Sequence, residues 1–443
     1  MSSKSRTEIL PAKPGGSDEA DDSQQGIHRL PVELLDLVLQ CLWEDKPAII
    51  ACSRVSRLWN EAAHPHLFAF LKIASSSDFS EFPASLHAHP NITRHVRKLE
   101  LKNAQRRISW TDHFAPLADF KFPEINRTQL CDLIAPLPHL QELHLYELCL
   151  LDSPGPAPDA RDDLPHRTLE KLTFSRCRAR APGSHTPLAT LLNLVSVFAS
   201  VGTLELISMH LSDFLPARLI RPARVGALVT RDAGLPPGSE DELFEALRES
   251  LVPGCLRALQ LGSLGHATAR EAGTVRAFGE LVGSAARDAL CIHIPFFLTI
   301  AVKPREDDPE YWRTLNLHAC TSLRTLGLEL SIPPLESTHI PRVPLSHVCI
   351  ALLANMPLTV RVLVLKLWGL DANWQVQLAN TDRLGLRALD DALAGGRHDH
   401  LERVEVMLDA RHCAWREECE VGVGEALPRL RAKGVLVVVD WVP

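Results

Sequence analysis

A short pattern of apolar residues recurs along most of the chain and constrains its fold more than any other feature. The pattern is apolar-x-x-apolar-x-apolar, as in LQELHL at positions 140–145 and LRTLGL at positions 323–328. Full copies begin at residues 96, 140, 169, 256, 323 and 360, a weaker copy begins at 401, and partial copies begin at 203 and 291. Because successive side chains of a strand point to opposite faces, each copy predicts a short strand with one apolar face.

The segments between these strands have the spacing of amphipathic helices. Apolar residues recur in them at intervals of three and four, in the sets Leu191, Leu194 and Phe198; Leu243, Phe244, Leu247 and Leu251; and Leu386, Leu389 and Leu393. Strands that alternate with helices in this way predict a parallel sheet with the helices on the outside.

The strand–helix unit resembles a divergent leucine-rich repeat. Its length varies, since 29 residues separate Leu143 from Leu172 and 37 separate residues 326 and 363. A gap of 55 residues between Leu204 and Leu259 leaves room for a degenerate copy at 224–229. The resemblance implies an α/β fold in which residues 96–443 form an irregular leucine-rich-repeat-like solenoid with parallel strands.

The first 68 residues lack the strand motif and divide into two parts. Residues 1–26 are too poor in apolar side chains to offset the entropy of ordering, so we predict a disordered tail. Residues 27–68 are predicted to form three short helices. Pro31 is expected at the first position of the first helix, Pro47 marks the second, and the third covers residues 54–63.

The first of these helices has more apolar surface than a small module can bury. Glu33, Asp36 and Gln40 are its only polar residues between positions 32 and 42, and their spacing confines them to one narrow strip. The remaining apolar surface predicts a binding partner. In the alternative interpretation, a three-helix bundle buries all of these apolar residues in its own core.

The same segment resembles an F-box, a short helical motif. The resemblance lies in LPVELL at positions 30–35, IIACSRVSRLW at 49–59 and HLF at 66–68. The sequences FPASL at 82–86 and HVRKLEL at 95–101 are similar to the stretch that follows the F-box in many fungal F-box proteins. On this basis residues 27–68 are interpreted as the F-box, and residues 69–95 as a linker or first cap of the solenoid.

The F-box resemblance implies a partner. This partner is the Skp adaptor of a Skp–cullin–F-box ubiquitin ligase, and through the adaptor a cullin. The positions that match the adaptor-contacting pattern of the family are Leu30, Pro31, Leu34, Leu35, Val38, Ile49 and Trp59.

Composition argues against several other partners. The formal net charge of −7 does not favour nucleic acid. The longest apolar run, residues 291–302, is too short to cross a membrane. No apolar signal segment follows Met1 and the 11 cysteines include no CxxC pair, so we expect a reducing compartment, cytoplasmic and/or nuclear.

No motif predicts catalysis, a cofactor or a metal. GVG at 422–424 lacks the third glycine of a dinucleotide-binding loop. HDH at 398–400 lacks further metal ligands nearby and is predicted to be a solvated loop. We therefore expect a protein that is not an enzyme.

These observations favour a substrate receptor. The F-box would dock the adaptor, and the solenoid would hold an unknown target protein for ubiquitin transfer by other subunits. One alternative is a non-catalytic scaffold that binds a partner without delivering it for ubiquitination. Another is an enzyme with a new kind of site.

The repeat pattern also predicts where a target binds. In each strand the residues between the apolar positions point to the opposite, concave face. Among them, the candidate contacts are Tyr146, Lys171, Lys366, Trp368 and Arg403. The two aromatic residues are the stronger candidates, because aromatic side chains dominate interface energetics. In the other interpretation, Trp368 packs in the core beside the turn at position 369.

Overall fold

The chain divides into two compact units, Met1–Phe70 and Leu71–Pro443. The computed structural model describes residues 30–42, 45–104, 122–151, 167–180, 187–209, 222–231, 240–252, 254–261, 280–281, 288–294, 317–332, 345–370, 374–379, 384–409 and 416–441. The tail predicted at residues 1–26 lies outside the described residues. The division falls near the start of the segment interpreted as a linker or cap, residues 69–95.

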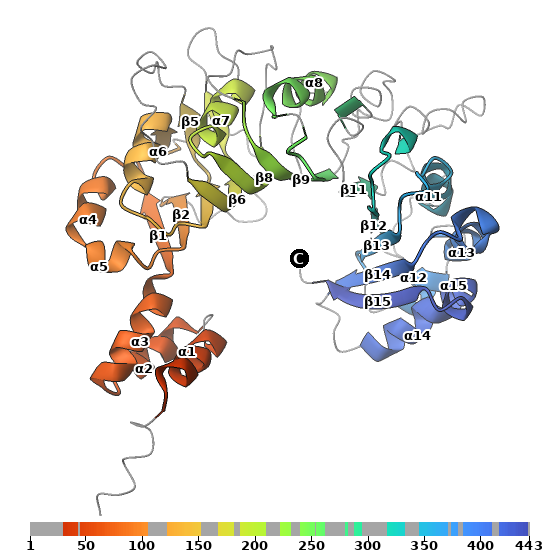
Figure 1. Cartoon of the computed structure of the whole chain (residues 1–443), viewed down its shortest axis with the longest axis horizontal. Helices are drawn as coiled ribbons and strands as arrows, with labels where there is room; N and C mark the ends of the chain where they lie inside the picture. The colour runs from red at the N-terminus through yellow and green to blue at the C-terminus, as the bar shows by residue number, and fades with distance from the viewer. Residues whose placement is uncertain are drawn as a thin grey trace, which may run out of the picture. The chain divides into compact units, whose positions relative to one another are not determined.

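Three helices form the first unit, called the helical module below. They are α1 (Val32–Cys41), α2 (Lys46–Ser53) and α3 (Arg57–Phe68), which Figure 1 draws in red and orange. Asp45 caps α2 by accepting a hydrogen bond from the Ala48 N–H at 3.0 Å. The hydroxyl of Ser56 caps α3 by accepting from the Trp59 N–H at 3.3 Å. The core consists of Leu35, Leu39, Ile49, Trp59 and Ala63.

Two helix boundaries differ from the prediction. Pro31 has a ψ of 144°, so it is the N-cap of α1 and not its first helical residue. The third helix begins at Arg57 and not at residue 54, because residues 54 and 55 still complete the last turn of α2 through hydrogen bonds to Ala51 and Cys52. It then continues through Pro65 to its end at residue 68.

Twelve strands form one sheet in the order β1-β2-β4-β6-β8-β9-β10-β11-β12-β13-β14-β15. Each neighbouring pair from β2 to β15 is parallel. The bounds are β1 (Phe70–Ser75), β2 (Lys98–Asn103), β4 (Glu142–Tyr146), β6 (Thr168–Ser175), β8 (Ser200–Ile207), β9 (Val225–Arg231), β10 (Ala258–Leu261), β11 (Ala289–Ile294), β12 (Thr325–Ser331), β13 (Val362–Trp368), β14 (Arg403–Asp409) and β15 (Leu436–Trp441). The α/β class with a parallel sheet agrees with the prediction.

One column of leucines crosses this sheet. In the strand register, Leu143 pairs with the leucines of β2 and β6, and Leu326 pairs with those of β11 and β13. The whole column is Leu99, Leu143, Leu172, Leu204, Leu228, Leu259, Leu290, Leu326, Leu363, Val404 and Leu436. All of these side chains except Leu436 are buried.

Helices pack against the leucine face of the sheet, and strand and helix side chains share one core. They are α4 (Phe82–Ala88), α6 (Arg127–Ile134), α7 (Pro187–Val195), α8 (Glu240–Ser250), α11 (Leu345–Leu353), α12 (Trp374–Ala379), α13 (Leu386–Ala394), α14 (Arg416–Ala426) and α15 (Pro428–Ala432). A short helix, α5 (Pro90–Thr93), follows α4. Two 3-10 turns are η7 (Leu317–Ala319) and η8 (Gly396–His398). The three helices predicted from apolar spacing correspond to α7, α8 and α13, which confirms them.

A left-handed residue follows four strands at the same place in the repeat. Glu147, Arg176 and Ser208 follow β4, β6 and β8 with φ of 54°, 52° and 48°, and Gly369 follows β13 with φ of 81°. The N–H groups of the first three donate to the carbonyl that ends the next strand, at 2.9, 2.9 and 2.7 Å. A non-glycine residue in this conformation costs roughly 1–2 kcal/mol, so the hydrogen bond across the sheet offsets a strained turn.

The strand predictions are confirmed, including those from the partial and degenerate motifs, since every motif lies on a strand of the large sheet. Five strands are not anticipated by the motif. Two are the sheet's edges, β1 and β15. The others form a small parallel sheet of β3 (Glu124–Asn126), β5 (Cys149–Leu151) and β7 (Arg178–Arg180), and three residues are too few to show a periodicity.

Truncation of one leucine in the column tests how much the column contributes to stability. We expect Leu326→Ala to lower the free energy of unfolding of the second unit by about 2–5 kcal/mol, because it leaves a cavity beside two other leucines. Thr325→Ala, the next residue on the same strand, is the control and is expected to change it by less than about 1 kcal/mol. Urea unfolding measures both, and similar losses in the two variants would contradict the assigned faces.

Candidate protein-interaction surfaces

Helix α1 has two apolar faces. Leu35 and Leu39 point into the core of the helical module and are fully buried. Leu34 and Val38 lie on another face and are 46% and 43% exposed. Together with Leu37 and Cys41, which are also exposed, they form a stripe with i, i+3, i+4, i+7 spacing. This spacing is typical of a helix face that packs against other elements, but in α1 the side chains of the stripe are exposed to solvent.

The exposed apolar side chains of the described residues are concentrated in the helical module. Eleven large apolar residues of the described chain are exposed, and seven belong to this unit of about 40 described residues. The seven are Val32, Leu34, Leu37, Val38, Ile50, Val55 and Leu58. On α1 the exposed residues share one helix face, and an exposed apolar patch larger than scattered single residues marks an interaction site.

The seven predicted adaptor contacts separate into two groups. Leu34 and Val38 are exposed, as is Pro31, and Leu30 is partly buried against the core. Leu35, Ile49 and Trp59 instead belong to the core, at 0%, 0% and 8% exposure. The residues predicted as adaptor contacts are therefore not all on the surface, and the alternative in which a three-helix bundle buries them all is not complete either. Helix α1 supplies both a core face and a surface face. The exposed residues Leu37, Ile50, Val55 and Leu58 were not among the predicted contacts.

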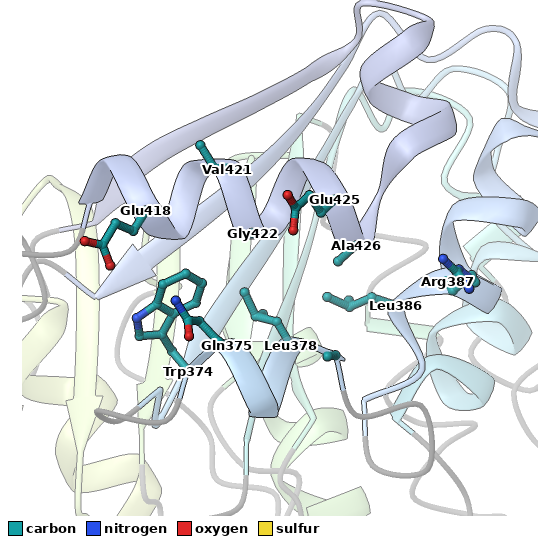
Figure 2. A pocket seen from close by; sticks show the side chains of 11 residues that line it. Trp374, Gln375, Leu378, Leu386, Arg387, Glu418, Val421, Gly422, Glu425 and Ala426 are labelled. Atoms are coloured by element: carbon teal, nitrogen blue, oxygen red, sulfur yellow. The ribbon is translucent and has the colours of Figure 1, made fainter.

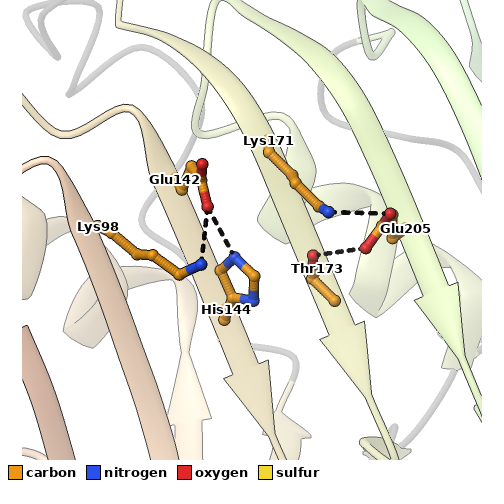
Figure 3. Close-up of polar contacts among 6 residues, drawn as sticks. All are labelled: Lys98, Glu142, His144, Lys171, Thr173 and Glu205. Atoms are coloured by element: carbon orange, nitrogen blue, oxygen red, sulfur yellow. Dashed lines mark hydrogen bonds and ion pairs between the residues drawn. The ribbon is translucent and has the colours of Figure 1, made fainter. Parts of the chain in front are cut away.

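A polar ladder lies on the face of the large sheet opposite the leucines. It comprises Lys98, Glu142, His144, Lys171, Thr173 and Glu205, drawn in Figure 3. Lys98 Nζ lies 3.1 Å from Glu142 Oε2 on the next strand. In the same way, Lys171 Nζ lies 3.0 Å from Glu205 Oε1, which is on β8. Thr173 donates to the other oxygen of Glu205 at 3.1 Å, so each carboxylate of the ladder has two partners.

Burial tunes the titration of His144, which lies 3.2 Å from Glu142. Burial and the nearby charge of Lys98 lower the pKa of His144 below its ordinary value of 6.5. Burial tends to raise the pKa of Glu142, but hydrogen bonds from Lys98 and His144 outweigh it and leave that pKa below 4.5. At neutral pH the imidazole is therefore uncharged and the Glu142 carboxylate is ionised.

A second polar cluster on this face spans β10 to β13. Glu329 accepts from Lys366 Nζ at 2.8 Å and from Gln260 Nε2 at 2.8 Å. The side chains of Glu329 and Lys366 are only 4% and 14% exposed. Burial raises the pKa of the adjacent Cys291 to about 12, and the charge of Glu329 adds to this effect. The thiol is therefore protonated and unreactive at neutral pH.

The five predicted target contacts lie along this polar face, but three of them are charges with an internal partner. Lys171 pairs with Glu205 and Lys366 with Glu329. Arg403 pairs with Glu405. Tyr146 accepts from Arg176 Nη1 at 3.1 Å and lies under its guanidinium. Trp368 is partly buried at the end of β13. A target would have to compete with most of these contacts.

Two further sequence motifs take structural roles. GVG at 422–424 lies inside α14, where a side chain on Gly422 would come within 2.5 Å of Trp374. His398 of the HDH motif is buried, so the predicted solvated loop is wrong for that residue. Asp399 is exposed, as predicted, and pairs with Lys433 at 2.7 Å. Among the described residues, no three His, Cys, Asp or Glu side chains gather as metal ligands would.

Comparison with known proteins does not assign a family. Neither a protein-family model nor a curated protein matches the sequence. Within the described ranges, every helix is too short or too polar to span a membrane.

The lowered pKa of His144 predicts a pH dependence of stability. As pH falls below about 6.5, the unfolded chain takes up a proton that the partly buried His144 resists in the folded state, so the folded second unit loses stability. We expect the fall in the urea midpoint between pH 7.5 and 5.5 to be smaller in His144→Gln than in the wild type. The same substitution at exposed His318 is the control, and an equal fall in wild type and His144→Gln would refute the effect.

The buried Glu329–Lys366 pair predicts an asymmetry between single and double replacements. Lys366→Met leaves the carboxylate buried without its cation and is expected to lower the free energy of unfolding by about 3–5 kcal/mol. The double variant Lys366→Met with Glu329→Leu is expected to recover most of this loss. Arg429→Met, which removes the pair with Asp391 in which both side chains are more than half exposed, at 63% and 53%, should cost less than about 1 kcal/mol. Equal losses in all three variants, measured by urea unfolding, would contradict the burial argument.

Proposed function

We propose that this chain is an F-box protein that serves as the substrate-recognition subunit of a Skp–cullin–F-box ubiquitin ligase. The helical module binds the Skp adaptor, which connects it to a cullin. The second unit is a leucine-rich-repeat-like solenoid that binds a target protein. Other subunits ubiquitinate the target, so this chain contributes proximity and not chemistry.

The observation that carries the proposal is the exposed stripe of α1. A module of three short helices with five core residues has little stability to spare, yet it leaves seven large apolar side chains in solvent. Their burial by a partner is favourable at about 25 cal/mol for each Å² removed from water. The LPVELL and IIACSRVSRLW sequences, which resemble an F-box, cover the same helices.

The structure refines which residues we propose as adaptor contacts. They are Leu34, Leu37, Val38, Ile50, Val55 and Leu58, all exposed. Leu35, Ile49 and Trp59 support them from beneath, as the core that fixes α1 against α3. The contact between His66 Nε2 and Asp36 Oδ1, at 2.6 Å, joins the same two helices on the polar side of α1.

Charge placed on the exposed stripe tests the adaptor site. We expect Leu34→Asp with Val38→Asp to weaken binding of a purified Skp-family adaptor by at least about thirtyfold, since a central apolar contact is worth about 2 kcal/mol or more. The loss arises because two carboxylates must be desolvated at the interface. Isothermal titration calorimetry with the full chain measures the affinity.

The control for this test is Leu358→Asp, which places the same charge on an apolar residue of the second unit that is 69% exposed. It should leave adaptor binding unchanged. The thermal unfolding midpoint of each variant is measured in parallel. It should stay close to that of the wild type, because both stripe residues lie outside the core. Unchanged affinity in the Leu34 and Val38 double variant would refute the F-box assignment. If the adaptor binds but no co-purified protein becomes ubiquitinated, a scaffold is the better description.

A further inference from the structure

Helices α12, α13 and α14 surround a groove with a volume of about 690 Å³. Figure 2 shows α14 along one side, with Trp374 and Leu378 of α12 opposite it and Leu386 of α13 toward one end. Val421 of α14 adds an apolar side chain that is 51% exposed. The groove is therefore open to solvent and has a mixed lining, because Trp374, Leu378 and Leu386 are nearly buried and Gln375, Arg387, Glu418 and Glu425 also line it.

The sequence of α14 permits this geometry. A Cβ atom at position 422 would come within 2.5 Å of the Trp374 ring, so only glycine lets α14 approach α12 as it does. Trp374 is buried and holds this contact. The groove is thus formed by a specific close approach of two helices, and the volume falls in the range of about 300–1,000 Å³ that is typical of ligand sites.

The charges at the groove lack internal partners, unlike those of the polar ladder. Glu418 and Glu425 lie seven residues apart and so on the same face of α14, and Arg387 lies at the α13 end. In the part of the chain that the structure describes, none of these three side chains forms an ion pair. The α14 wall of the groove is therefore negatively charged, and its α13 end carries one positive charge.

We propose that this groove is the target-binding site of the protein and that it takes a short extended peptide segment with apolar and basic residues. This inference rests on the proposed function as a substrate receptor. Apolar side chains of the peptide contact the exposed Val421, with the nearly buried Leu378 and Leu386 as the floor of the groove, and its lysine or arginine residues pair with Glu418 and Glu425. The two glutamates are about 10 Å apart along the helix axis. Basic residues two or four positions apart share one side of an extended chain, about 7 or 13 Å from each other, and are the spacings that reach both glutamates.

The volume and the charges decide between occupants. A site of this size holds a few side chains and not a whole helix of about 10 Å diameter. The acidic wall disfavours nucleic acid, whose phosphates it would repel. The same wall favours a basic segment, because complementary charges across an interface select partners.

The test uses the full chain and a displayed library of random twelve-residue peptides as the probe. We expect selection to enrich peptides that combine large apolar residues with lysine or arginine. The strongest peptide, labelled with fluorescein, is then titrated by fluorescence anisotropy. Glu418→Lys with Glu425→Lys is expected to raise its Kd at least tenfold. Glu417→Lys with Glu420→Lys makes the same charge change on other faces of α14 and should raise the Kd less than twofold.

Several outcomes would overturn the proposal. These are the absence of an enriched family of this composition, an unchanged Kd in the Glu418 and Glu425 variant, or an equal loss in the two double variants. A concentration-dependent dimer of the wild type that the Glu418 and Glu425 variant abolishes would assign the groove to a second copy of the chain. Adaptor affinity and unfolding midpoint are measured on the same preparations. If the peptide experiments overturn the groove but the adaptor still binds, the proposed function stands. Loss of adaptor binding in the Leu34 and Val38 variant is a separate result, because that surface does not include the groove.

Discussion

The burial of one leucine against the next, across neighbouring parallel strands, is the interaction on which the second unit depends. A strand such as β10 has four residues and cannot bury its own apolar face alone. It does so because the leucines of β9 and β11 lie in register beside Leu259. A shift of one residue would place leucines in solvent and charged residues such as Glu142 or Lys171 in the core. The leucine column therefore fixes the register of the strands from β2 to β15 in the large sheet.

The fixed register determines the chemistry of the opposite face. It brings Lys98 beside Glu142 and Lys171 beside Glu205, although each pair is separated by more than 30 residues in the chain. The same alignment places Glu329 and Lys366 together on β12 and β13. These charges satisfy one another and hold neighbouring strands together. A face rich in lysine and glutamate is consequently a structural surface first, and its charge is not simply available to a partner.

The sequence predicts the repeated elements well because the leucine motif combines a strand periodicity with a buried column. It does not predict β15, whose LVVVDW sequence lacks the alternation of the other strands. Nor does it predict the left-handed turns, because Glu147, Arg176 and Ser208 stand where glycine or asparagine would signal them. In α1 the adjacent residues Leu34 and Leu35 are equally apolar, and only the packing of α3 separates surface from core. The groove depends on tertiary contacts between α12, α13 and α14 that no single segment reveals.

Within the described residues, the two proposed binding surfaces have apolar side chains that no element covers or charges without a counter-ion, and this distinguishes them from the large sheet. In the sheet, apolar residues have leucine neighbours and charges have counter-ions, so each face is largely satisfied within its own unit. On α1 the apolar stripe lacks a cover in the first unit, and at the groove Glu418 and Glu425 lack a cation among the described residues of the second. Each surface is built by one unit alone, so substitutions in one leave the core of the other intact. The proposed receptor function depends on this separation, because it requires one surface for a constant adaptor and another, independently variable surface for a target.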